Sequence, residues 1–146
     1  MTLDEIVHAA RERTGLADPD RDSWREGLEI LLHDHTKVDL LSERGWERIQ
    51  ARYVDALAAR MGVDDFIRRN RGVTEGPVVR PVFILGMPRT GTTMVSGMMD
   101  ADPANRSLLK WEAYNVAPPA QPGATRSDPR CTAEKAKDEL ILKANR

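Results

Sequence analysis

The chain has 146 residues and a formal net charge of −1, and 40% of its residues are hydrophobic. This composition is typical of one globular domain, and the charge gives no reason to expect binding to nucleic acid or acidic lipid. The longest apolar runs are far shorter than the roughly 18 residues of a membrane span. The single cysteine, Cys131, excludes an internal disulfide and suits a reducing compartment. Because no secretion signal is visible, we expect the cytoplasm.

The first half of the sequence predicts amphipathic helices. Apolar residues recur every three or four positions over 2–15, 23–32 and 42–61. The first two stretches open on the Ser/Thr-x-x-Glu pattern of a capping box. A shorter fourth helix is expected over 64–67. A connector with two prolines follows at 73–81, and it predicts a boundary between a helical N-terminal region and a second domain. The two expected parts are residues 1–75 and residues 76–146.

The centre of the chain reads as strand, loop and helix. Residues 82–85 form an unbroken apolar run, which is typical of a strand buried on both faces. Gly86 ends the run, and a tight loop leads to a helix that begins at Thr92. Met94, Met98 and Met99 fall at helical spacing in this helix and are expected to fill a core.

The remaining residues predict one more strand and one more helix. Apolar residues in 108–111 are candidates for a second short strand, and the proline-rich stretch 117–123 must be irregular. Asp128 and Pro129 are the N-cap and first position expected of a helix that runs toward Arg146. A parallel sheet usually has five or six strands. We therefore expect an incomplete α/β fold, the first part of a longer domain.

The loop before the central helix predicts an anion-binding site. The first N–H groups of a helix lack intrahelical partners, and the helix dipole adds positive charge there. Gly91 allows a phosphate to approach the backbone, and Arg89 supplies a fixed cation. The hydroxyls of Thr90, Thr92 and Thr93 can donate hydrogen bonds to phosphate oxygens.

The order of residues in this loop narrows the choice of ligand. The spacing Gly86-x4-Gly91 is that of a P-loop, but Thr92 stands where a nucleoside triphosphatase carries Lys. The sequence PRTGTT after a buried strand resembles the 5′-phosphosulfate loop of sulfotransferases that use 3′-phosphoadenosine 5′-phosphosulfate (PAPS). It is most similar to the bacterial branch and to the tyrosylprotein sulfotransferases.

The resemblance implies a P-loop-like sulfotransferase fold, with PAPS as co-substrate and no metal. Arg89 and residues 90–93 would bind the donor. A sulfuryl group would pass to the hydroxyl, or amine, of a small-molecule acceptor. Glu112, about twenty positions after the loop, would be the general base, with Arg89 as its catalytic partner. The family binds the 3′-phosphate through a later strand and helix, for which these residues have no counterpart, so activity of the 146 residues alone is left open.

Two other functions are compatible with the residues. A P-loop nucleoside triphosphate kinase or hydrolase would share the loop spacing, although it would need the missing lysine. A non-catalytic helical interaction module would use the N-terminal region alone. The sequence does not indicate the oligomeric state or the acceptor.

Overall fold

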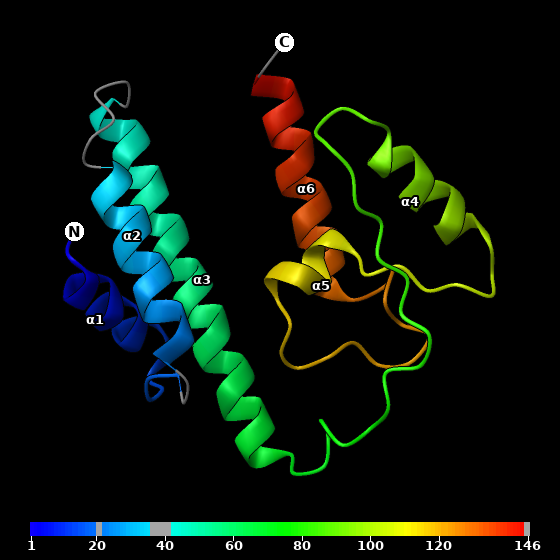
Figure 1. The fold of residues 1–146 in the computed structure, drawn as a ribbon, viewed down its shortest axis with the longest axis horizontal. Coiled ribbons are helices and arrows are strands. Elements are labelled where there is room, and N and C mark those ends of the chain that lie inside the picture. The colour runs from blue at the N-terminus through cyan, green and yellow to red at the C-terminus, as the bar shows by residue number, and fades with distance from the viewer. Residues whose placement is uncertain (20–21, 36–41, 145–146) are drawn as a thin grey trace.

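The computed structural model describes residues 1–19, 22–35 and 42–144, and the regular structure within them is helical (Figure 1). The N-terminal elements are α1 (Leu3–Thr14), the 3-10 turn η1 (Asp22–Trp24), α2 (Arg25–His35) and α3 (Glu43–Arg69). The later elements are α4 (Thr92–Ala101), α5 (Lys110–Tyr114) and α6 (Pro129–Ala144). Figure 1 shows α1, α2 and α3 grouped on one side and the later helices on the other.

Helix α1 has the ends that its sequence predicts. The Thr2 hydroxyl accepts from the Glu5 N–H at 3.3 Å, and the Thr2 N–H donates to the Glu5 carboxylate at 2.8 Å, which completes the capping box. At the other end Gly15 has φ 65°, and its N–H donates to the Arg11 carbonyl at 2.7 Å. This left-handed position favours glycine.

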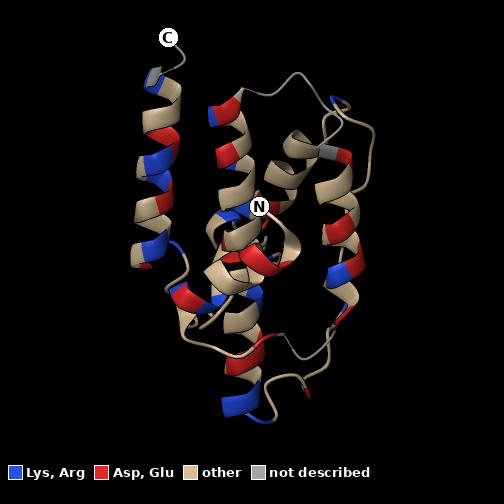
Figure 2. Cartoon of the chain, turned by 90° about the vertical axis from the view of Figure 1, so that its left-hand side faces the viewer, with Lys and Arg blue, Asp and Glu red and all other residues tan. Residues whose placement is uncertain are grey.

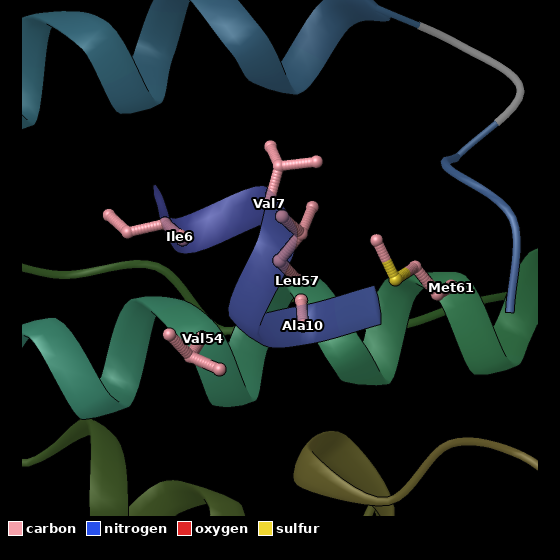
Figure 3. Close-up of a cluster of buried hydrophobic side chains, with 6 residues drawn as sticks. All are labelled: Ile6, Val7, Ala10, Val54, Leu57 and Met61. Atoms are coloured by element: carbon pink, nitrogen blue, oxygen red, sulfur yellow. The ribbon is translucent and has the colours of Figure 1, made fainter. Parts of the chain in front are cut away.

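The core of the N-terminal part lies between α1 and α3. Figure 3 shows side chains from the two helices converging, and all of them are buried. The core residues are Ile6, Val7, Ala10, Val54, Leu57 and Met61. Partly buried residues of α2, including Leu28 and Leu32, pack against this cluster. An ion pair between Arg13 and Asp55 joins α1 to α3 at the surface.

Two details of the expected helices are wrong. The third and fourth expected helices are one helix, α3, which passes through Gly62 without a break. Packing of the apolar face outweighs the cost of about 1 kcal/mol for a glycine in a helix interior. The capping box expected at Ser23 does not form, because this residue lies in the 3-10 turn η1. Its hydroxyl accepts from Arg60 instead, at 3.3 Å.

The α/β prediction is not confirmed, since the described residues contain no strand. Residues 82–85 run without regular structure, and no backbone hydrogen bond joins 76–86 to another described segment. Phe83 and Leu85 are 80% and 90% exposed, although burial on both faces was expected. A strand exists only through pairing with a neighbour, and no other extended segment among the described residues pairs with this one. Met94 and Met98, which were expected in a core, are also exposed, because the described residues form no sheet against which α4 could pack.

The second expected strand is also wrong, because Trp111 lies in the short helix α5. The Trp111 side chain is 2% exposed, and its indole N–H donates to the Thr125 carbonyl at 3.2 Å. Lys110 forms ion pairs with Glu134 at 3.1 Å and with Asp138 at 2.5 Å, which tie α5 to α6. The predicted start of α6 is confirmed: the Asp128 carboxylate accepts from the Arg130 N–H at 2.9 Å.

Charged residues of both signs are interspersed along the helices (Figure 2). The last turn of α3 is basic through Arg68 and Arg69. None of the described helices combines the length and the hydrophobicity needed to cross a membrane.

Candidate functional site: the loop before α4 and the carboxylate of α5

The loop from Gly86 to Gly91 turns sharply into α4. Arg89 has φ 68° and Gly91 has φ 89°, so two of its residues adopt the left-handed region. The N–H and the hydroxyl of Thr90 both donate to the Met87 carbonyl, at 3.3 Å and 2.6 Å. These bonds close the turn within a few residues.

Gly86 is required by the close approach of the loop to itself. A Cβ atom at this position would lie 2.7 Å from Oγ1 of Thr90 and 2.8 Å from Cγ2 of Thr92. Both distances are shorter than ordinary van der Waals contacts. The glycine therefore allows the loop to bring the threonines beside the end of the extended segment.

The N-terminus of α4 offers unpaired backbone donors. Gly91 is the N-cap and has no side chain to accept from the helix, and the first helical bond runs from the Val95 N–H to the Gly91 carbonyl at 3.0 Å. The N–H groups of residues 92–94 make no hydrogen bond within the part of the chain that the structure describes. The first turn also has no acidic residue. This end of α4 therefore has the polarity of an anion site.

Arg89 precedes these donors by a few residues in the same loop. The Arg89 side chain is exposed, and it forms no ion pair with any described residue. A left-handed conformation costs a non-glycine residue of order 1–3 kcal/mol, and such strain concentrates at functional sites. Thr92 is half-buried and Thr93 exposed, and neither hydroxyl bonds to a described residue. The Thr90 hydroxyl differs, because it is already bonded to Met87.

Glu112 occupies a different setting in α5. It is 8% exposed, and its two carboxylate oxygens have different partners. Oε1 accepts from the guanidinium of Arg106, and Oε2 accepts from the Leu109 N–H at 2.9 Å. Arg130 is a second cation near Glu112. The pKa of the Arg130 guanidinium is raised, mainly by its hydrogen bond to Asp128 and to a smaller extent by the negative charge of Glu112.

The structure brings Arg89, Gly91, Thr92 and Thr93 together, but it forms no hydrogen bond or ion pair between this group and Glu112. Beside Arg106 lies an open pocket of about 310 Å3. Its lining residues are Asp100, Asn105, Arg106, Ser107, Leu109, Gly123, Thr125 and Arg126. Among the described residues, no three His, Cys, Asp or Glu side chains gather as they would around a metal ion.

The sequence interpretation missed both partners of Glu112. The contact with the Leu109 N–H could have been predicted from the sequence, because a Glu three positions after the N-cap residue can accept from the N-cap N–H. Arg106 had none, since it lies six residues before Glu112 in an irregular segment.

The geometry is of a class that can hold an anion: a glycine-containing turn that leads into a helix with unpaired first N–H groups in the described part of the chain. Residues 81–144 match the sequence model of the sulfotransferase family. The crystal structure of sulfotransferase STF9 from Mycobacterium avium is similar over 98% of this chain, with 40% identity and a TM-score of 0.88. Sulfotransferase STF1 from Mycobacterium tuberculosis H37Rv is similar over the whole chain, with 28% identity and a TM-score of 0.83. The chain belongs to the sulfotransferase family.

The matched part is well under half of each solved enzyme. The chain spans 36% of the length of STF9 and 40% of the length of STF1. No curated protein sequence matches it. The backbone path described above is therefore that of solved sulfotransferases over the matched part only.

Proposed function

We propose that this chain provides the donor-binding loop and the general base of a sulfotransferase that uses PAPS. The observation that carries the proposal is the N-terminus of α4, where the N–H groups of residues 92–94 adjoin Arg89 and neither has a partner among the described residues. PAPS would supply an activated sulfuryl group, and its 5′-phosphate is an anion of the kind that the N-terminus of α4 could hold. The resemblance of the PRTGTT loop to the family's 5′-phosphosulfate loop supports this choice of donor.

The loop residues would act through preorganised electrostatics. The N–H groups of α4 and the hydroxyls of Thr92 and Thr93 would hold the 5′-phosphate. Arg89 would neutralise the negative charge that grows on the phosphate as it leaves. Thr90 would keep the turn closed through its bonds to Met87.

Glu112 would take the proton of the acceptor hydroxyl or amine while the acceptor atom attacks the sulfur. A base needs a fixed orientation, and the Leu109 N–H supplies one by holding Oε2 at 2.9 Å. We infer a small-molecule acceptor, residues 76–146 as the part that holds the donor, and residues 1–75 as its helical support. The cytoplasm is the proposed place of action, because a single cysteine suits a reducing compartment.

A comparison of two titrations tests the proposal. The desulfated nucleotide, 3′-phosphoadenosine 5′-phosphate, should bind in preference to Mg-ATP, because Thr92 replaces the lysine that a triphosphate requires. Arg89→Ala should weaken this binding about tenfold or more, the loss expected when a charge-assisted contact is removed. Arg80→Ala is the matched control, since Arg80 is also exposed with a positive φ but lies outside the loop. Preference for Mg-ATP would point to a P-loop kinase or hydrolase instead.

A further inference from the structure

The carboxylate of Glu112 is covered in the arrangement that the structure describes. Each carboxylate oxygen already has a donor, Arg106 on Oε1 and the Leu109 N–H on Oε2. The carboxylate is nearly buried, so a third group has little room to approach it. Each oxygen can still accept a second hydrogen bond, but departure of one of the two donors would open its oxygen to an acceptor.

The two donors differ in how easily they can leave. The Leu109 N–H is a backbone group at the N-cap of α5, and the Leu109 carbonyl accepts from the N–H groups of Glu112 and Ala113, at 3.0 Å and 3.2 Å. Arg106 reaches Glu112 through a long side chain that is 62% exposed, from a segment without regular structure. An exposed guanidinium gives up an ion pair at little cost, because water and other acceptors replace it. Arg106 is the donor that can move.

Space for this movement lies beside Arg106. Arg106 lines the open pocket of about 310 Å3 together with the polar residues Asn105, Ser107 and Thr125. The nearby Arg126 is held by an ion pair with Asp100 at 2.6 Å, so it does not compete for Glu112. A small molecule that enters this pocket meets Arg106, whereas Glu112 is not among the residues that line it.

We propose that Arg106 is a positioning residue that covers Oε1 of Glu112 until an acceptor, entering through this pocket, takes its place. The acceptor O–H then donates to Oε1, and its proton passes to that oxygen as the acceptor oxygen forms its bond to sulfur. The bond between sulfur and the 5′-phosphate oxygen of the donor breaks in the same step, and the desulfated nucleotide leaves with the electron pair. Arg106 keeps its own proton throughout, since a guanidinium does not lose it in proteins. The Leu109 N–H holds Oε2 before and after this exchange.

This inference rests on the proposed base role of Glu112 but not on how the donor binds. Titration with the desulfated nucleotide reports on the loop at 86–93. A failure there counts against the proposed function and leaves the relationship between Arg106 and Glu112 to be decided by its own experiment.

The experiment measures how fast Glu112 reacts with a water-soluble carbodiimide and glycinamide in the full chain. Peptide mass spectrometry gives the labelling rate of each carboxylate. We expect Glu112 to be labelled about two- to fivefold faster in Arg106→Gln, because a weak competing ion pair is removed. Arg106→Lys should restore slow labelling. Arg126→Gln is the matched control and should leave the rate at Glu112 unchanged.

Hydrogen exchange at the Leu109 N–H separates a positioning role from a structural one. In Arg106→Gln this N–H should keep its protection, because Oε2 still accepts from it. Unchanged labelling of Glu112 would overturn the inference, since Arg106 would then not cover the oxygen. Faster labelling together with lost protection at Leu109 would also overturn it, because Arg106 would then only stabilise α5.

The route through the pocket has a test of its own. Ser107→Trp, added to Arg106→Gln, should fill the pocket and return the labelling of Glu112 to the slow rate. Fast labelling in this double variant would show that the carboxylate is reached from another side and would overturn the proposed entry path.

Discussion

The guanidinium of Arg130 lies over the ring of Trp111, 4.6 Å from the ring centroid. The two residues belong to α6 and α5, so this cation–π contact joins the helix of the candidate base to the C-terminal helix. Arg130 also forms an ion pair with Asp128 at 2.8 Å and donates to the Pro118 carbonyl at 2.7 Å. The buried face of α5 is therefore held in place by one side chain with several partners.

This arrangement makes the stability of the C-terminal part depend on pH. The hydrogen bonds from Arg130 lower the pKa of the Asp128 carboxyl from 3.8 to about 2. A lowered folded-state pKa means that the pair contributes its full stability above the unfolded value of 3.8, and that this contribution is lost as the pH falls toward 2. Urea denaturation between these pH values should show the loss in the wild type. The Asp128→Asn variant should have a lower free energy of unfolding at neutral pH. Its free energy of unfolding should also fall less than that of the wild type as the pH is lowered, because Asn cannot be protonated. An identical pH profile in the two proteins would contradict this.

The core between α1 and α3 predicts a sharp difference between two isoleucines. Ile6 is fully buried, whereas Ile30 of α2 is 54% exposed. Ile6→Ala should lower the free energy of unfolding by about 2–5 kcal/mol, because it removes apolar contacts and leaves a cavity. The same substitution at Ile30 should cost less than about 1 kcal/mol. Chemical denaturation of the two variants measures both values, and equal losses would mean that the core lies elsewhere.

Gly86 should be needed for binding rather than for folding. In Gly86→Ala the new methyl group would meet Thr90 and Thr92 at less than 3 Å, so the loop must move. We expect the affinity for the desulfated nucleotide to fall by about tenfold, or ~1.4 kcal/mol. The control is Gly76→Ala, since nothing lies within 4 Å of a Cβ at that position. Unchanged affinity in Gly86→Ala would show that the turn can open without loss.

Glu112→Gln separates proton transfer from the local structure of α5. The amide oxygen of Gln can still accept from the Leu109 N–H, but it cannot serve as a base. In a sulfotransferase assay we expect turnover to fall by about 10²–10⁴-fold, the usual contribution of general base catalysis, with little change in nucleotide affinity. Glu139→Gln, on α6, serves as the control. Full turnover in Glu112→Gln would remove this residue from the base role.

Helix ends were predictable from the sequence because they depend on local chemistry. The caps at Thr2 and Gly15, and the start of α6 at Asp128, each involve residues within a few positions. The beginning of α4 after Gly91 follows the same rule. The first residues of the candidate site could therefore be located without a structure.

Features that depend on distant residues could not be predicted in this way. The apolar run 82–85 has the composition of a buried strand, but burial and pairing require neighbours that the described residues do not provide. The run around Trp111 was ambiguous, because a short apolar segment fits a strand or a helix equally well. The ion pair of Arg106 with Glu112 has no periodic signal at all.

The central claim is that the first N–H groups of α4 hold the 5′-phosphate of a sulfuryl donor. The most direct measurement is a nuclear magnetic resonance titration of the ¹⁵N-labelled chain with 3′-phosphoadenosine 5′-phosphate. We predict that the amide signals of Thr92, Thr93 and Met94 shift most, because their N–H groups gain an acceptor that the described residues do not supply. If these three signals stay in place at saturating nucleotide, or if the large shifts lie outside residues 86–94, the claim is contradicted.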